Sequence, residues 1–268
     1  MTESPSLSIP FDKHRFSSAA AFYDAYRVAY DEAVIAWAAR EAGVDRAARV
    51  LDLGCGPGSL AVPLARLAGE VVGLDPEPAM LAMAAERAGR EKVAVRLVEG
   101  SSNDLSVVPG PFRLVTMGRS FHWMDRAATL AALDGMVDPG GAVALFGDTS
   151  PRTAGWWDTA GAIAQRLAPD GMTARVWRGD PAWAPHEAIL LASPFCALER
   201  YGRLRVERIG IDHVVGRLLS LSSTSPHRLG ERRGAFEAEV REALAPMAGA
   251  DGLFEQIVET TVLLARRA

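Results

Sequence analysis

The 268-residue chain has few of the features that mark secreted, membrane-spanning or nucleic-acid-binding proteins. Its two cysteines, Cys55 and Cys196, are typical of a protein in a reducing cytoplasm rather than one held together by disulfides. No apolar run approaches the roughly 18 to 20 residues of a membrane span, and the first residues lack the order of a secretory signal. The net charge of −4 comes with no block of like charge. We therefore expect a cytoplasmic protein with neither a membrane nor a nucleic acid as partner.

The residues present indicate an α/β fold. Residues 19–42 are apolar at helical spacing and Gly43 follows as a stop, which predicts one continuous N-terminal helix. Short β-rich runs then alternate with Ala-rich helical stretches up to residue 147. Such alternation is typical of a doubly wound, mostly parallel sheet.

The pattern becomes irregular after residue 148 and resumes later as a strand over 196–204, helices over 206–221 and 234–244, and a strand over 257–264. With the earlier runs this gives seven strands. We divide the chain into an N-terminal helical lid (1–42), an α/β core (43–149), an inserted helical cap (150–194) and a C-terminal part that completes the sheet (195–268).

A glycine-rich turn follows the strand that contains Asp52, with glycines at positions 54, 56 and 58. Glycines there let the backbone turn sharply and approach a ligand, and the following helix presents free N–H groups. The spacing is not the G-x-G-x-x-G of dinucleotide-binding folds. Asp52 beside the loop would repel a pyrophosphate but attract a positively charged ligand, which argues against NAD.

The next strand ends in Asp75, where an acidic side chain can accept hydrogen bonds from both ribose hydroxyls of a bound nucleoside. Met80, about one helical turn later, can pack on an adenine face. Each residue also has a purely structural interpretation, with Asp75 as a helix cap and Met80 as part of the core.

Together these residues resemble the class I S-adenosylmethionine-dependent methyltransferases, and the resemblance covers about residues 11–148. It implies a Rossmann-like sandwich with S-adenosylmethionine as cofactor. Where the family usually has an acid after the third strand, this chain has Ser101, so the Ser101 hydroxyl or the Ser102 backbone N–H would take that place at the adenine. We interpret Cys55 as a small packing residue of the loop. The implied cofactor contacts in the core are Asp52, Gly54, Cys55, Gly56, Gly58, Asp75, Pro76, Met80, Ser101, Ser102, Gly118 and Phe121.

The stretch from Gly118 to Asp125 resembles the Ala-Phe-His-Trp-Phe-Asp segment of the branch that contains trans-aconitate methyltransferases. It lacks the Asn/Asp-Pro-Pro-Tyr motif of enzymes that methylate nucleic-acid bases. His122 is the catalytic candidate, because an imidazole can take a proton from a substrate hydroxyl or hold a substrate carboxylate. Alternatively, His122 supports the loop and Trp123 packs beside it. An ionised carboxylate acceptor would need no base.

The segment from Tyr23 to Tyr30 resembles the Tyr-x-x-x-Arg-Pro-x-Tyr segment that closes over the cofactor in this branch, with Val28 in place of the proline. The resemblance places Tyr23 and Arg27 at the cofactor, where Arg27 would pair with its carboxylate, and Tyr30 at the substrate. The alternative is an amphipathic helix with an exposed arginine.

Trp123, Trp156 and Trp157 are candidates for the acceptor pocket, and core packing is the alternative for the last two. No spacing of His, Asp or Glu resembles a metal site.

We therefore predict methyl transfer to a small-molecule acceptor, at the oxygen of a hydroxyl or carboxylate, in natural product biosynthesis. N- or C-methylation, a cyclisation on the same fold and a cofactor-sensing role are the alternatives. Monomer and homodimer both remain open.

Overall fold

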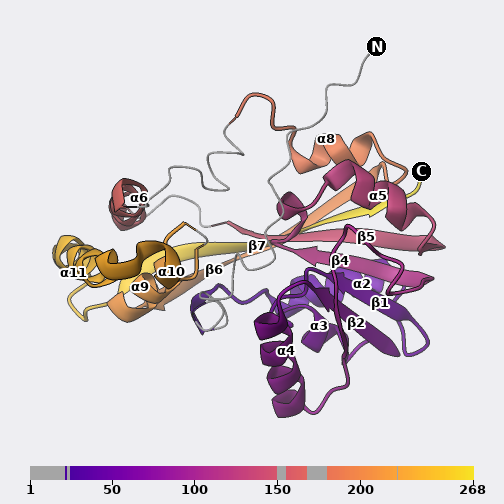
Figure 1. The fold of residues 1–268 in the computed structure, drawn as a ribbon, viewed down its shortest axis with the longest axis horizontal. Helices are drawn as coiled ribbons and strands as arrows, with labels where there is room; N and C mark the ends of the chain where they lie inside the picture. Colours follow the sequence, from indigo (N-terminus) through magenta and orange to yellow (C-terminus); the bar gives the residue numbers. More distant parts are fainter. Residues whose placement is uncertain (1–21, 23–24, 150–154, 168–179, 222) are drawn as a thin grey trace.

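The computed structural model describes residues 22, 25–149, 155–167, 180–221 and 223–268, and it is built on one seven-stranded sheet (Figure 1). The strand order is β3-β2-β1-β4-β5-β7-β6. The first five strands pair in parallel, and β7 is antiparallel to both of its neighbours. This confirms the predicted doubly wound α/β fold. The strands are β1 (Arg49–Leu53), β2 (Glu70–Asp75), β3 (Arg96–Glu99), β4 (Phe112–Gly118), β5 (Val137–Thr149), β6 (Ala197–Ile209) and β7 (Phe254–Arg266).

Helices cover both faces of the sheet. Helices α2 (Glu32–Glu41), α3 (Ala61–Leu64) and α4 (Pro78–Glu91) lie on one side, and α5 (Arg126–Asp134) and α8 (His186–Leu191) lie on the other (Figure 1). The short 3₁₀-helix η1 (Phe121–Trp123) joins β4 to α5.

Each central strand is apolar on both faces, which is why its sequence reads as an unbroken apolar run. In β1, Leu51 and Leu53 pack toward the α5 side, whereas Val50 packs toward α2 and α3. Because β1 pairs in parallel with both β2 and β4, the carboxyl ends of these three strands meet at one edge of the sheet. That edge is the usual place for a ligand in an open α/β fold.

A second apolar core lies where β6 and β7 run past the rest of the sheet. Here α6 (Gly155–Leu167), α9 (Ile211–Leu219), α10 (Pro226–Leu229) and α11 (Arg233–Leu244), with the 3₁₀-turns η2 (Gly230–Arg232) and η3 (Ala245–Met247), gather at one end of the molecule (Figure 1). We call this group the helical lobe. Trp156, Phe236, Val240 and Phe254 are buried in it.

The C-terminal half differs from the sequence prediction in two ways. The helix expected over 206–221 begins only at Ile211, because residues 206–209 continue the ladder of β6 with β7. The interval 150–194, expected to be one cap, contributes α6 to the lobe but α8 to the face of α5. Residues 150–154 and 168–179 of that interval lie outside the described residues.

The continuous N-terminal helix predicted over 19–42 is also wrong. The backbone is not helical over 27–31, and α2 begins at Glu32. The Asp31 side chain caps the new helix by accepting a hydrogen bond from the Ala33 backbone N–H at 2.8 Å. Val28 and Tyr30 are buried as parts of this irregular segment. Their spacing in the sequence is the same as that of an apolar helix face, but in the structure they are buried without forming a helix.

Candidate active site

Three glycines with positive φ form the turn after β1. The φ angles are +69° at Gly54, +52° at Gly56 and +77° at Gly58, a region that favours glycine. A Cβ on Gly54 would lie 2.6 Å from the Cβ of Ser120, so this glycine is required for packing. A Cβ on Gly56 would meet no atom of the described residues within 4 Å. The open side of Gly56 is therefore a cradle that a ligand can approach and that a side chain would fill.

Asp75, at the end of β2, is tied directly to this turn. Its Oδ2 accepts a hydrogen bond from the Gly56 backbone N–H at 2.8 Å, and its Oδ1 accepts one from the Glu77 N–H at 2.9 Å. An ionised carboxylate has about four acceptor positions, so it can accept two hydroxyls beyond these bonds. The residue is 8% exposed. Burial raises the pKa of Asp75 to about 6, although the bonds from Glu77 and Gly56 oppose the shift.

Asp52 lies deeper, at 1% exposure. Its Oδ1 accepts from the Thr116 hydroxyl at 2.8 Å and its Oδ2 accepts from the Ala61 N–H at 3.0 Å, at the first residue of α3. Burial raises the pKa of Asp52 to about 7; the bonds from Thr116 and Ala61 oppose this shift, and the charge of Asp75 adds to it. A positively charged neighbour would stabilise the ionised form of such a buried carboxyl group.

Cys55 is buried in the turn and feels the charges of both carboxyl groups. Burial raises the pKa of its thiol well above the ordinary value, and the charges of Asp52 and Asp75 raise it further. The thiol is therefore protonated at neutral pH and is not a nucleophile. This favours the interpretation of Cys55 as a packing residue of the turn.

A cleft brings several of the predicted residues together. Tyr30, Asp52, Gly54, Cys55, Gly56, Pro57, Ser59, Leu60, Gly118 and Arg119 line it. Tyr30 packs edge-on against Phe146, with ring centroids 5.7 Å apart, and the guanidinium carbon of Arg119 lies 4.4 Å above the Tyr30 ring. A Cβ on Gly118 would lie 2.8 Å from the Tyr30 hydroxyl. Glycine at 118 therefore allows Tyr30 to come this close to the end of β4.

Other predicted cofactor contacts do not line this cleft, and Asp75 reaches it only through its bond with Gly56. Pro76, Ser101 and Ser102 are half-buried beyond the ends of β2 and β3, and the Ser101 hydroxyl accepts a hydrogen bond from the Asn103 N–H at 3.3 Å. Met80 and Phe121 are buried, and Phe121 belongs to the core beneath α5. Their contacts with a cofactor stay predictions, as does that of Tyr23, which lies outside the described residues.

His122 lies on η1, half-buried among other rings rather than in the cleft itself. Its ring centroid is 4.5 Å from that of Trp123 and 6.5 Å from that of His186 on α8. No local pattern pairs His122 with His186, because the two residues are far apart in the chain and approach each other only where α8 packs on α5.

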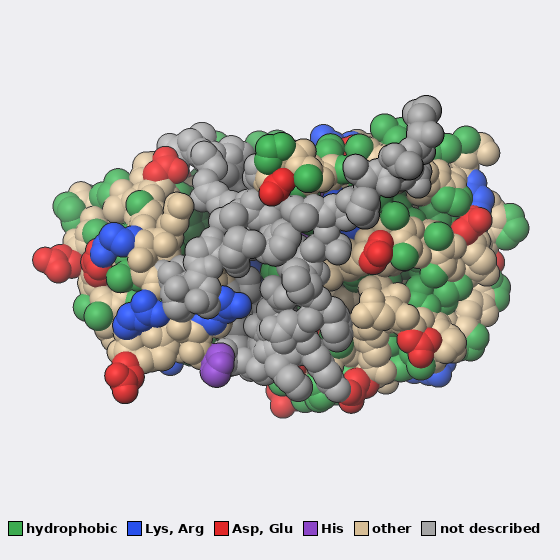
Figure 2. All heavy atoms as spheres, turned by 45° about the horizontal axis from the view of Figure 1, so that its top comes forward, with side chains coloured by type: hydrophobic (Ala, Val, Ile, Leu, Met, Phe, Trp, Pro, Cys, Tyr) green, Lys and Arg blue, Asp and Glu red, His purple; other side chains and the backbone are tan. Residues whose placement is uncertain are grey.

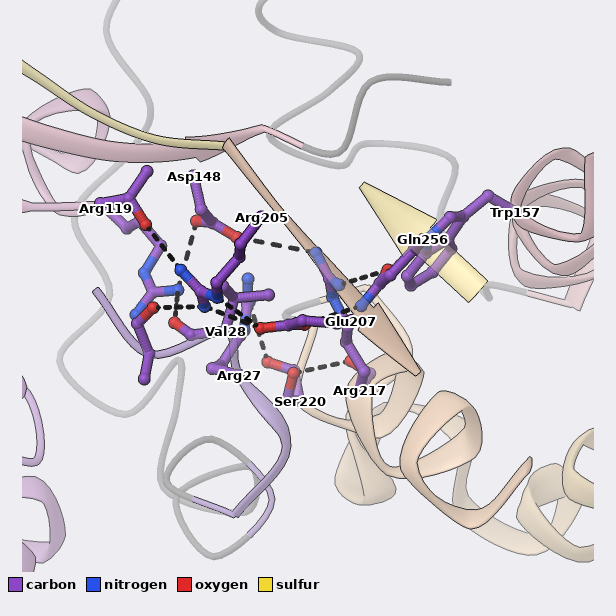
Figure 3. Close-up of polar contacts among 12 residues, drawn as sticks. Arg27, Val28, Arg119, Asp148, Trp157, Arg205, Glu207, Arg217, Ser220 and Gln256 are labelled. Atoms are coloured by element: carbon purple, nitrogen blue, oxygen red, sulfur yellow. Dashed lines mark hydrogen bonds and ion pairs between the residues drawn. The ribbon is translucent and has the colours of Figure 1, made fainter. Parts of the chain in front are cut away.

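The two neighbouring tryptophans have different surroundings. Trp156 is buried in the lobe core and its indole N–H donates to the Glu255 carbonyl, which favours the packing interpretation. Trp157 turns toward the sheet, where its N–H donates to Gln256 at 2.9 Å and its ring lies 4.6 Å from the guanidinium carbon of Arg217 (Figure 3). Trp157 is therefore the tryptophan that faces the junction between core and lobe.

Arg119, which sequence reasoning missed, and Arg27, which it placed at the cofactor, also lie at this junction. Arg119 follows Gly118 with a φ of +56°, and its guanidinium donates to the Val28 carbonyl and to Asp148 (Figure 3). Arg27, predicted at the cofactor carboxylate, donates to the Ser220 carbonyl at the end of α9. The position of Arg119 directly after Gly118, where β4 ends, is a signal in the sequence that could have marked it as a site residue.

On the face drawn in Figure 2, acidic side chains are scattered among the described residues rather than gathered in one patch. Within the described part of the chain, no helix combines the length and apolarity needed to cross a membrane. Among the same residues, no three His, Cys, Asp or Glu side chains converge as metal ligands would.

Residues 50–141 match the model of a methyltransferase domain family. The chain is 28% identical to an uncharacterized methyltransferase of Mycobacterium tuberculosis over 186 residues, which are 69% of this chain and 68% of the relative. It is 36% identical to the ubiquinone biosynthesis O-methyltransferase of Xanthomonas campestris over 129 residues, which are 46% of this chain and 53% of that protein.

The fold is similar to that of a solved methyltransferase. The structure of an S-adenosylmethionine-dependent methyltransferase from Thiobacillus denitrificans in complex with S-adenosyl-L-homocysteine superposes with a TM-score of 0.52, at 17% identity. The superposition covers 98% of this chain and 100% of that one. At this identity the likeness concerns the fold.

Proposed function

We propose that the chain is a class I S-adenosylmethionine-dependent methyltransferase, that its cleft binds S-adenosylmethionine, and that the methyl group passes to an oxygen of a small molecule. The match of residues 50–141 to a methyltransferase domain family and the similarity to relatives named methyltransferases support this proposal. The observation that supports cofactor binding is the cradle at Gly56, whose backbone N–H donates a hydrogen bond to the buried Asp75 carboxylate. The name of the O-methyltransferase relative supports oxygen as the methylated atom.

The residues present fit this cofactor. Asp75 can accept both ribose hydroxyls in addition to its two backbone bonds. Asp52 supplies negative charge at the cleft for a cation. When bound, S-adenosylmethionine supplies a methyl group on a positively charged sulfonium. Since that positive charge disperses during transfer, the protein contributes chiefly by aligning the acceptor and by excluding water.

His122 has two roles open to it, which depend on the acceptor. For a hydroxyl acceptor, the imidazole would take the proton as the oxygen attacks. For a carboxylate acceptor, no proton needs to leave, and His122 would hold the substrate or support η1. Its half-buried position beside Trp123 and His186 is compatible with either role.

The test is a turnover assay with S-adenosylmethionine and a panel of phenols, hydroxy acids, carboxylic acids and amines. The proposal expects S-adenosylhomocysteine and an acceptor that is one methyl group heavier, attached through oxygen. The Gly56→Val variant, with its cradle filled, is the matched control and should give neither product. Conversion of a substrate without S-adenosylhomocysteine would point to a cyclisation, and binding without turnover would point to a sensor.

A role in natural product biosynthesis, a cytoplasmic location and the choice between monomer and homodimer stay predictions. Mass photometry of the purified chain settles the last of these.

A further inference from the structure

The first residue of α5 is an arginine that the protein buries almost completely. Arg126 is 1% exposed and is the largest of the fully buried side chains among the described residues. Its neighbour Asp125 is exposed, and the Asp125 carboxylate accepts a hydrogen bond from the Ala128 N–H at 3.1 Å as the cap of the helix. A cation is unfavourable at this end of a helix, because the helix dipole is positive there. Both the burial and the position of Arg126 therefore oppose its charge.

The contacts of Arg126 leave part of its guanidinium unsatisfied. Nη1 donates to the Ala184 carbonyl at 2.6 Å and lies 3.3 Å from Nδ1 of His186. The guanidinium carbon lies 3.8 Å from the centroid of the Trp183 ring. Nη2 is buried as well, but it has no hydrogen-bond partner in the described part of the chain. One nitrogen of a buried guanidinium is thus left with two N–H groups to donate.

None of these contacts supplies a full negative charge. Because a guanidinium can only donate hydrogen bonds, Nδ1 of His186 accepts, and an imidazole that accepts at Nδ1 is neutral. No carboxylate of the described residues forms an ion pair with Arg126. Burial lowers the pKa of Arg126, and the charge of Asp125 opposes this shift without cancelling it. A buried charge without an ionic partner costs folding free energy, and an anion beside Nη2 would offset that cost.

Arg126 lies beneath a surface segment rather than in the middle of the core. This segment, residues 180–185, leads into α8, which packs against α5 (Figure 1). Most of its residues are exposed, and Trp183 is half-buried. The Trp183 N–H donates to the Asp180 carbonyl at 2.9 Å, so the segment is closed by a local turn. Since surface loops move more readily than the elements that they join, a shift of Trp183 off the guanidinium would open Arg126 to a ligand.

His186 connects this arginine with the candidate base. Its ring centroid lies 6.5 Å from that of His122 and 5.1 Å from that of Phe121, and both of these residues belong to η1. The same 3₁₀-helix begins two residues after Arg119, which lines the cleft. An anion held by Arg126 would therefore be anchored close to His122, on the element that joins the cleft to α5.

We propose that the methyl acceptor is a hydroxy acid, that Arg126 binds its carboxylate through Nη2, and that its hydroxyl oxygen receives the methyl group. A carboxylate fits a guanidinium in charge and in planar geometry. Once bound in this way its lone pairs are engaged, so the hydroxyl is the better nucleophile. The hydroxyl oxygen bonds to the methyl carbon, the bond from that carbon to sulfur breaks to leave S-adenosylhomocysteine, and the hydroxyl proton passes to His122. This inference rests on the proposed function, since it identifies the acceptor of that reaction.

The test uses three pairs of probes that differ in charge but hardly in shape: salicylate and salicylamide, mandelate and mandelamide, and lactate and lactamide. Binding is measured by calorimetry at constant ionic strength in saturating S-adenosylhomocysteine, which fills the cofactor site. We expect at least one acid to bind about tenfold or more tightly than its amide, the scale of a hydrogen bond to a charged group.

Arg126→Met should remove that preference, because methionine fills similar space without charge or donors. Arg126→Lys should retain part of it, since the charge remains without the planar fork; it also decides the question if Arg126→Met does not fold, because its preference must then fall below that of the wild type. Arg267→Met is the matched control, because Arg267 contacts the opposite end of α5, where it pairs with Asp134 and lies over the Phe195 ring. This control should keep the preference for the acid. Folded variants, identified by their thermal midpoints, should bind S-adenosylhomocysteine within about twofold of the wild type.

The inference is overturned if no acid binds better than its amide, or if the preference survives in Arg126→Met or is lost equally in Arg267→Met. A large loss of S-adenosylhomocysteine affinity in folded Arg126→Met would overturn it too, since Arg126 would then serve the cofactor. Conversion of an acid probe to its methyl ester would refute the assignment of the hydroxyl as the methylated group. Failure of wild-type protein to bind S-adenosylhomocysteine at all would instead refute the proposed function, so the two failures are distinguishable.

Discussion

Replacing Asp52 by Asn should stabilise the protein while weakening its hold on the cofactor. The asparagine keeps the shape of the side chain. Its amide oxygen can accept from the Ala61 N–H, and its amide nitrogen can donate to the Thr116 hydroxyl, which then donates to the Leu51 carbonyl at 3.5 Å. The substitution therefore removes a buried charge without leaving a polar group unpaired.

The size of the effect follows from the pKa of Asp52, which burial raises from 3.8 to about 7. Between these two pH values the unfolded chain has lost a proton that the folded protein retains, so wild-type stability falls as pH rises through this window. At about 1.4 kcal/mol per pKa unit the full cost is about 4 kcal/mol, fully developed above pH 7. Asp52→Asn should escape this cost at pH 8 and gain almost nothing at pH 4.

The assay is calorimetric unfolding at pH 5, 6.5 and 8. Even half of the full gain would raise the thermal midpoint at pH 8 by about 4 °C or more. Asp104→Asn is the control, since that exposed carboxyl has its pKa lowered by Ser106 and should gain nothing. An Asp52→Asn variant no more stable than wild type at pH 8, or equally stabilised at pH 5 and pH 8, would refute the reasoning.

Three further predictions concern the cleft and its surroundings. Gly56→Val should abolish S-adenosylmethionine binding in calorimetry, because its side chain fills the cradle and resists a φ of +52°; retained binding would make the loop a mere turn. His122→Asn should lower kcat by about 10² to 10⁴ if His122 is a general base, but change mainly KM for a carboxylate acceptor, and wild-type kinetic values would leave it a structural role. Trp156→Ala should destabilise the protein by about 3 to 5 kcal/mol in urea unfolding, because Trp156 is buried in the lobe core, whereas Trp157→Phe should cost far less; equal losses would contradict the distinction.

The sequence was sufficient for those parts of the site that depend on local backbone chemistry. The glycines after β1 could be located because a sharp turn favours glycine, and Asp75 could be located because it ends the apolar run of β2. The core strands could be located because burial on both faces produces apolar runs.

What could not be predicted depends on contacts between distant segments. The apolar spacing over 19–42 continues through residues 27–31, so only the contact of this segment with the sheet and lobe reveals the break. Arg217 reaches Asp148 because β7 pairs with both β5 and β6, so that α9, which follows β6, begins near the end of β5. No local sequence pattern predicts a contact between such distant segments. The proximity of His122 to His186 could not be predicted for the same reason.

The most direct test of the account is calorimetric titration of S-adenosylmethionine into wild-type protein and Asp75→Ala. We predict that the wild type binds, that its affinity rises with pH through about 6 as the Asp75 carboxyl ionises, and that Asp75→Ala loses about 1.5 to 3 kcal/mol of binding free energy. Unchanged affinity in a folded Asp75→Ala variant would contradict the assignment of Asp75 and, with it, the placement of the cofactor in this cleft.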